Sequence, residues 1–196
     1  MKSRLLLFLL VLLLSCNNDY TPKPKALIKL DFPKKEYERI AINCPFDFEF
    51  PIYSKLKKKN DDCLIDIVFP NQNGVLYLSY FALENNLNEH AEQSQKLAYK
   101  HNIIADAITE QFYVNDSLKV YGVLYDYDGV SATAIQFFLT DSVSHFFRGA
   151  LYFNTEINDS ILPINNFLKY DIKHLIETFH WKDKKGESPP VKAELQ

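Results

Sequence analysis

Six stretches of the chain carry the apolar pattern that is typical of β-strands. They are rich in β-branched and aromatic residues and are bounded by turn-forming residues such as Asn, Asp, Gly and Pro. The first two stretches are separated by Pro70-Asn71-Gln72-Asn73, which predicts a β-hairpin. The predicted strands span residues 63–69, 74–81, 109–114, 119–127, 131–140 and 144–153.

Two further stretches have apolar residues three and four positions apart, which is the period of an amphipathic helix. The first runs from Leu87 to Ile108 and the second from Pro163 to Trp181, where Pro163 suits the first helical turn. The order of strands, helix, strands and helix predicts an α+β fold, with an antiparallel β-sheet and two main helices packed on it. We expect one domain over residues 26–182.

The amino terminus has the organisation of a secretory signal peptide. Lys2 and Arg4 precede an apolar run from Leu5 to Leu14, and the small residue Ser15 follows that run. At 1.5 Å per helical residue such a run spans about 15 Å, roughly half of a hydrocarbon core of ~30 Å. The run is therefore too short for a transmembrane helix, and we expect residues 1–15 to be removed on export.

The motif Leu13-Leu14-Ser15-Cys16 resembles the bacterial lipobox, with Leu14 as a mild departure from the preferred small residue. The resemblance implies that the Cys16 sulfur receives a diacylglyceryl group, and that the new amino group is acylated after cleavage. Each buried methylene contributes roughly 0.8 kcal/mol, so more than one acyl chain gives stable anchoring in a bilayer. Residues 16–25 are polar and contain two prolines, so we expect an extended tether. Residues 183–196 are charged and contain Gly and Pro, which indicates a flexible C-terminal tail.

Composition limits the partners that this chain can have. The sequence has 15 Phe and 12 Tyr, an aromatic content that favours a packed core over disorder. Its net charge of −3 shows no basic excess of the kind that indicates nucleic-acid binding.

Two cysteines remain beyond the lipobox, namely Cys44 and Cys63. Export places them in an oxidising compartment, which favours a disulfide over the alternative of two buried free thiols. A bridge would close a loop of about 20 residues and contribute about 3 kcal/mol in the chain-entropy model. We expect no metal site, because no Cys or His lies at ligand spacing from either residue.

The sequence contains none of the common catalytic or cofactor-binding motifs. The chain has no nucleophile-elbow, H-E-x-x-H, EF-hand or phosphate-loop pattern, so we predict no catalytic residues, no metal and no cofactor. His101 falls on the apolar stripe of the first helix, where a core or boundary histidine is the ordinary interpretation. The segment Tyr125–Gly129 is interpreted as a strand end entering an Asp-Gly turn, and Lys55–Lys59 as a charged loop, with contact to anionic headgroups as the alternative. The histidines are His90, His101, His145, His174 and His180.

Eight stretches of the chain form a recognisable set: Asp19–Ala26, Leu97–His101, Ala105–Ile108, Ile135–Phe137, Leu139–Ser142, His145–Asn154, Asp171–Ile172 and His174–Phe179. Together they resemble the gliding-motility lipoprotein D family (GldD) of the Bacteroidota, from about Cys16 to Lys182. The resemblance implies a cell-envelope lipoprotein required for gliding and associated with the type IX secretion machinery. It carries over Cys16 as the one functional residue and no catalytic residue. The order of elements is also similar to the Mog1/PsbP-type fold, an analogy of architecture only.

Three functional hypotheses follow. The leading one is a non-catalytic scaffold, which acylated Cys16 holds in the bilayer on the periplasmic side while an aromatic-bearing surface docks other gliding and secretion proteins. The alternatives are a periplasmic lipoprotein that binds a small ligand in an aromatic pocket, and a cell-wall hydrolase with clustered ionisable groups in a cleft. The sequence leaves open whether the anchor lies in the inner or the outer membrane.

Overall fold

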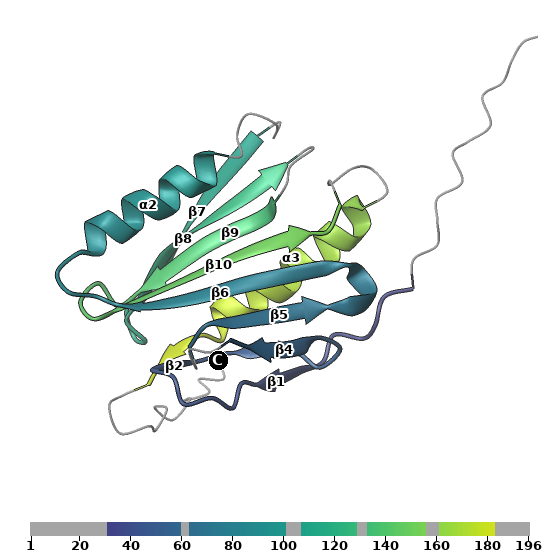
Figure 1. Cartoon of the computed structure of the whole chain (residues 1–196), viewed down its shortest axis with the longest axis horizontal. Coiled ribbons are helices and arrows are strands. Elements are labelled where there is room, and N and C mark those ends of the chain that lie inside the picture. The colour runs from purple at the N-terminus through teal and green to yellow at the C-terminus, as the bar shows by residue number, and fades with distance from the viewer. Residues whose placement is uncertain (1–30, 60–62, 101–106, 129–132, 156–160, 183–196) are drawn as a thin grey trace, which may run out of the picture.

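The computed structural model describes residues 31–59, 63–100, 107–128, 133–155 and 161–182. The predicted signal peptide, Cys16, the tether and the C-terminal tail lie outside these ranges, as does His101. The predicted α+β class is confirmed: an antiparallel sheet carries two helices (Figure 1).

The main sheet has seven strands in the order β4-β5-β6-β10-β9-β8-β7, and every neighbouring pair is antiparallel. The predicted hairpin is confirmed as β5 and β6, joined by a 3-10 turn (η1, Pro70–Gln72) and by Asn73 in the left-handed conformation. β10 pairs with β6, so the chain from β7 to β10 returns to the hairpin and extends its sheet. The strands are β4 (Lys55–Lys58), β5 (Ile65–Phe69), β6 (Gly74–Ala82), β7 (Ala107–Asn115), β8 (Val120–Asp128), β9 (Thr133–Thr140) and β10 (His145–Phe153).

The helices α2 (Leu87–Tyr99) and α3 (Leu162–Glu177) lie on opposite faces of this sheet (Figure 1). Both helices contact β9, and every residue of β9 is buried. A strand covered on both faces needs no polar alternation, which explains why Thr133–Thr140 is a nearly continuous apolar run. Edge strand β7, by contrast, has no fully buried residue.

Short strands from both ends of the described chain complete the layer around α3. β1 (Tyr37–Arg39) pairs with β3 (Glu49–Pro51), and β2 (Phe46–Asp47) pairs with β11 (His180–Trp181). These strands have two or three residues each, too few for a period to be recognised in the sequence.

The two sheet faces have separate apolar clusters. The larger cluster lies on the α3 side and includes Phe46, Phe147 and Phe179, whose rings are packed together. The smaller cluster lies under α2 and includes Phe138 and Phe146, stacked with ring centroids 5.1 Å apart. Fully burying one such side chain contributes about 1.5–3 kcal/mol, so these aromatic residues account for much of the stability of the fold.

Both predicted helices are shorter than their apolar periods indicate. The first ends at Tyr99, and Ala107 and Ile108 begin β7 because their backbone pairs with β8. The second ends at Glu177, and His180 and Trp181 pair with β2. In both cases pairing with another strand overrides a local helical spacing.

The prediction that Lys55–Lys59 is a charged loop was also wrong. Lys55–Lys58 form β4, the edge strand opposite β7, because Leu56 packs against the core and the backbone pairs with β5. The lysines suit this position, since charged side chains protect a sheet edge from pairing with other chains.

Candidate functional site

The chain is fastened to α3 close to the point where its described part begins. Lys35 Nζ lies 2.6 Å from Asp171 Oδ1 and 3.4 Å from the ring centroid of Phe167. Phe32 stacks on the same Phe167 ring, with centroids 4.4 Å apart. Burial lowers the pKa of Lys35, and Asp171 opposes that shift. A lipid anchor upstream of this segment would therefore be connected to the domain through packed contacts.

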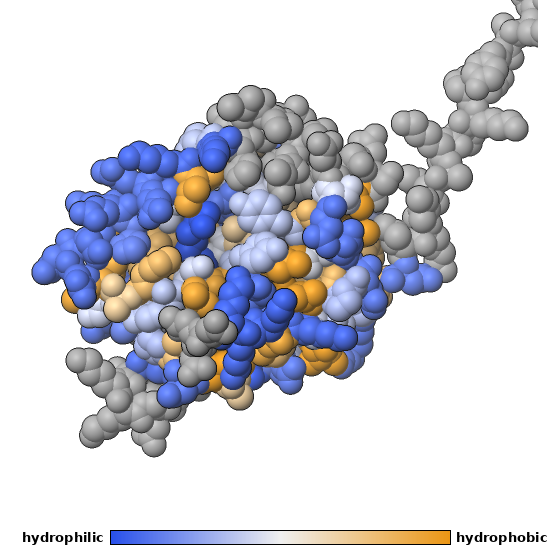
Figure 2. All heavy atoms as spheres, viewed as in Figure 1, coloured by the Kyte–Doolittle hydropathy of each residue, from blue (hydrophilic) through white to orange (hydrophobic). Residues whose placement is uncertain are grey.

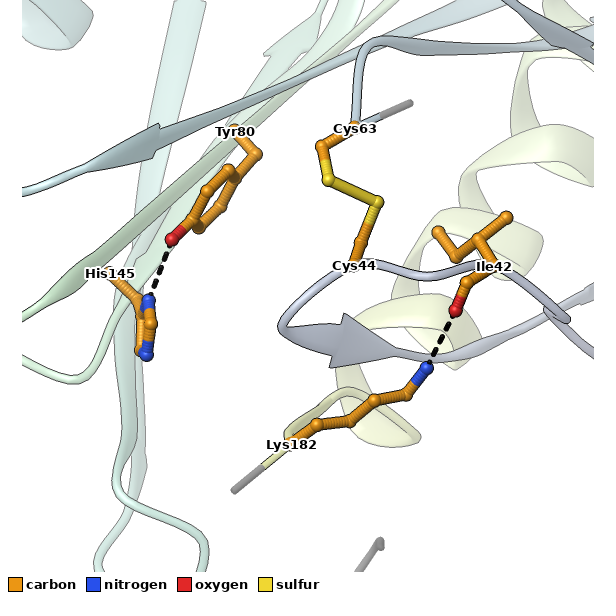
Figure 3. Close-up of a disulfide and its surroundings, with 6 residues drawn as sticks. All are labelled: Ile42, Cys44, Cys63, Tyr80, His145 and Lys182. Atoms are coloured by element: carbon orange, nitrogen blue, oxygen red, sulfur yellow. Dashed lines mark hydrogen bonds between the residues drawn. A yellow bond between two sulfur atoms is a disulfide. The ribbon is translucent and has the colours of Figure 1, made fainter. Parts of the chain in front are cut away.

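Cys44 and Cys63 form a disulfide with Cα atoms 5.7 Å apart (Figure 3). The bridge joins the segment before β2 to the segment before β5, two parts of the chain that share no strand pairing. Beside it, Lys182 Nζ donates a hydrogen bond of 3.0 Å to the Ile42 carbonyl oxygen. Both contacts hold the N-terminal segment against the rest of the fold.

The four described histidines occupy separate structural contacts. His90 lies between the rings of Phe81 and Phe146, and His174 bonds Glu49 at 2.9 Å. His145 Nδ1 lies 2.8 Å from the Tyr80 hydroxyl, and His180 Nδ1 bonds the Thr178 carbonyl oxygen. Within the described ranges, no group of three or more His, Cys, Asp and Glu side chains is arranged to hold a metal ion.

His145 and His180 do border one polar hollow of about 310 Å³, together with Asp141 and two lysines. Asp141 is already engaged there, since its Oδ1 accepts hydrogen bonds from the backbone N–H groups of Val143, Ser144 and His145. Burial by itself would raise the pKa of Asp141, but these donors outweigh burial and lower it. Asp141 therefore stabilises the turn between β9 and β10.

An apolar cavity of about 130 Å³ lies between α3 and strands β7 to β9. This volume is below the roughly 300–1,000 Å³ of typical small-ligand sites, whereas the polar hollow at His145 and a second hollow between α2 and β7 to β9, each of about 310 Å³, lie at the lower limit of that range. The lining residues of the apolar cavity are Gln111, Phe112, Tyr113, Val123, Leu124, Phe137, Leu139, Lys173, Ile176 and Glu177.

A candidate binding surface is the part of the main sheet that α2 leaves uncovered. α2 packs mainly on β9 and β10 and also meets β6, β7 and β8 at single residues, while β4 and β5 lie away from it (Figure 1). Figure 2 shows the same face, with a mainly hydrophilic α2 and with hydrophilic, pale and hydrophobic residues mixed over the neighbouring sheet. The strand registers place one continuous row of side chains on this face: Lys57, Asp66, Tyr77, Ala150, Gln136, Tyr125 and Glu110.

Two tyrosine rings pack together beside Lys59 on this surface. Lys59 pairs with Asp66 at 3.0 Å, and its Nζ lies 5.3 Å from the Tyr77 ring centroid. The Tyr77 and Tyr152 rings meet edge to face, with centroids 5.9 Å apart. We name the surface formed by Lys57, Lys59, Tyr77, Arg148 and Tyr152 the open sheet face.

Arg148 completes the open sheet face on β10, where Nη2 donates a 2.8 Å hydrogen bond to Gln136 Oε1. Tyr and Arg side chains are the types enriched where proteins bind one another. The sequence predicted an aromatic-bearing surface but not its residues, because they come from β4, β6, β10 and the segment after β4. The alternation within each strand is a local signal, whereas the register that joins the strands is not.

Among the described residues, no helix combines the length and the apolar character needed to cross a bilayer. A comparison with family models gives a match to the gliding motility lipoprotein GldD family over residues 17–181. The chain belongs to this family. No curated protein matches the chain.

Family membership implies a role in gliding motility and a lipid-anchored protein of the cell envelope. The family is not a known enzyme family. Since the match covers β1 to β11, the whole described fold falls within the family region.

Proposed function

We propose that this protein is a non-catalytic scaffold of the gliding and type IX secretion machinery, held at a membrane by acylated Cys16 and facing the periplasm. The open sheet face is the surface through which it docks other envelope proteins. The observation that carries this proposal is the combination of Tyr77, Tyr152 and Arg148 on a sheet face that α2 leaves uncovered.

Three features support an anchored scaffold. The lipobox precedes the first described residue by about 15 positions. An extended chain of this length spans up to about 50 Å, so the domain could lie that far from the bilayer surface. The chain then enters the fold through Lys35, which contacts buried Asp171 and the Phe167 ring. The described histidines and Asp141 are engaged in local contacts, as expected of a structural rather than a catalytic role.

The anchoring part is tested with Cys16→Ser in cells, with Ser15→Ala as the matched control. We expect Cys16→Ser to keep its signal peptide, carry no lipid and fail to restore gliding. Ser15→Ala keeps a small residue before the cleavage site and should be processed normally. Full motility from unlipidated Cys16→Ser protein would refute the anchoring role.

The docking part is tested with Tyr77→Glu, which introduces a charge on the open sheet face, where Tyr77 is 42% exposed. The matched control is Tyr170→Glu on α3, where the tyrosine is 70% exposed. We expect the first variant to be lipidated and as abundant as the wild type but unable to support gliding, whereas the control glides. Normal gliding of Tyr77→Glu would argue against this surface.

A further inference from the structure

Lys35, Lys169 and Lys182 are buried or partly buried cations of this fold. Lys35 and Lys169 pair with the carboxylates of Asp171 and Asp126, whereas Lys182 donates a hydrogen bond to the Ile42 carbonyl oxygen. Arg148 is also partly buried, yet none of the ion pairs in the described part of the chain involves it. A guanidinium withdrawn from water without a carboxylate is costly, because neutral acceptors recover only part of its hydration.

The protein nevertheless holds this guanidinium in place. Gln136, 2% exposed on β9, turns its Oε1 toward Arg148 and accepts a hydrogen bond from Nη2. This orientation leaves Gln136 Nε2 buried without a hydrogen-bond partner in the structure. Burial also lowers the pKa of Arg148, while Tyr152 and Tyr127 oppose that shift. A buried amide with an unpaired donor is unfavourable for stability, and Gln136 carries this cost while its Oε1 holds the Arg148 guanidinium.

The charge of the surrounding surface indicates which kind of partner would bind there. Lys57, Lys59 and Arg148 are cations of the open sheet face, and the nearby carboxylate of Asp66 is already paired with Lys59. A negative partner group would complement this surface, and a carboxylate matches the fork of a guanidinium with two parallel hydrogen bonds.

We propose that Arg148 binds a carboxylate side chain from an acidic segment of a protein that docks on the open sheet face, with Tyr77 and Tyr152 beside it. This inference rests on the proposed docking function and names the chemistry of the partner. The position of Arg148 favours a protein over a lipid surface. Arg148 is recessed on the central strand β10 beside the more exposed Tyr77, so a flexible Glu or Asp side chain reaches it more readily than headgroups in a flat bilayer.

The test uses the intact lipoprotein in nanodiscs of zwitterionic lipid. Binding of a fluorescein-labelled octaglutamate peptide is followed by fluorescence anisotropy, with octaglutamine as the uncharged control peptide. We expect Arg148→Gln to weaken octaglutamate binding by about tenfold or more, the loss of a charge-assisted bidentate pair. Octaglutamate binding by Arg148→Lys should be intermediate, because an ammonium keeps the charge but cannot form two parallel hydrogen bonds to a carboxylate. Lys173→Gln removes one positive charge from α3 on the other side of the sheet, and should change binding less than about twofold.

Thermal unfolding separates loss of binding from loss of folding. Because Arg148 has no carboxylate partner, we expect Arg148→Gln to unfold at the wild-type temperature or above it. If that variant unfolds at a lower temperature than the wild type, octaglutamate binding by Arg148→Lys and by Lys173→Gln is compared instead. Octaglutamate binding that is equal in the wild type and in folded Arg148 variants overturns the inference. Wild-type protein that binds phosphatidylglycerol vesicles but not octaglutamate overturns it as well, in favour of a lipid contact.

Failure of this inference differs from failure of the proposed function. If Tyr77→Glu abolishes gliding while Arg148→Gln glides normally, the result supports docking on the open sheet face and refutes the carboxylate contact at Arg148. If unlipidated Cys16→Ser glides, the anchored scaffold falls whatever the peptide measurements show.

Discussion

Lys35 and Asp171 form an ion pair across 136 residues of sequence, with Nζ 2.6 Å from Oδ1. The Asp171 carboxylate is buried on α3, with 1% of the residue exposed, and also accepts hydrogen bonds from the hydroxyls of Tyr37 and Tyr53. This one carboxylate therefore gathers donors from three points of the N-terminal segment. Any pull transmitted from a lipid on Cys16 would reach the core of the fold at this position.

Loss of the Lys35 charge is expected to loosen this attachment. Lys35→Met leaves the buried Asp171 carboxylate without its cation, and we expect a fall of about 2 kcal/mol in the free energy of unfolding. Urea denaturation measures the change. Lys34→Met is the matched control, because Lys34 is 85% exposed and its pair with Glu36 should contribute less than about 1 kcal/mol. Equal effects of the two substitutions would show that the buried pair has no special role.

The disulfide is expected to stabilise the fold through the loop that it closes. Replacing Cys44 and Cys63 together with Ala should lower the free energy of unfolding by about 3 kcal/mol, because the unfolded chain regains the entropy of that loop. Mass spectrometry of a non-reduced digest of the exported protein should recover the two cysteines in one linked peptide pair. Separate peptides with free thiols would contradict the bridge.

The turn between β9 and β10 is expected to weaken in acid. The pKa of Asp141 is lowered in the folded protein because three backbone N–H donors outweigh the effect of burial. For a carboxylate with a depressed pKa, the stabilisation is complete above the unfolded value of about 3.9 and is lost as the pH falls through the folded value.

The measurement compares wild type with Asp141→Asn. Near about pH 7 the variant should be less stable by about 1–2 kcal/mol, and near about pH 2 this difference should shrink. Hydrogen exchange at the amides of Val143, Ser144 and His145 should accelerate in the variant. A difference in stability that is the same at both pH values would exclude the carboxylate charge as its source.

A side chain at position 149 is expected to disrupt the core. A Cβ added to Gly149 on β10 would collide with the Phe137 ring of the neighbouring strand β9. We expect Gly149→Ala to cost about 1–3 kcal/mol, the usual range for overpacking. Gly74→Ala is the control, since its nearest neighbour would be the flexible Leu168 side chain at 3.2 Å and the cost should be smaller. Chemical denaturation of both variants provides the comparison.

The elements that the sequence predicts well are those with a strong local period. The strands of residues 63–153 and the two helices follow from apolar spacing and turn residues, and together they establish the α+β class. The lipobox motif ending at Cys16 and the family stretches are likewise local patterns, readable without a structure.

The tertiary structure decides what depends on pairing between strands. Ala107 and Ile108, predicted as helix, belong to β7 because they pair with β8, and the lysine-rich loop is instead edge strand β4 because it pairs with β5. Arg148 acquires its position only when β10 is placed between β6 and β9. Sequence periodicity specifies which face of its own strand a residue occupies, whereas register between strands specifies its neighbours. The open sheet face depends on register, and for that reason only the folded chain reveals it.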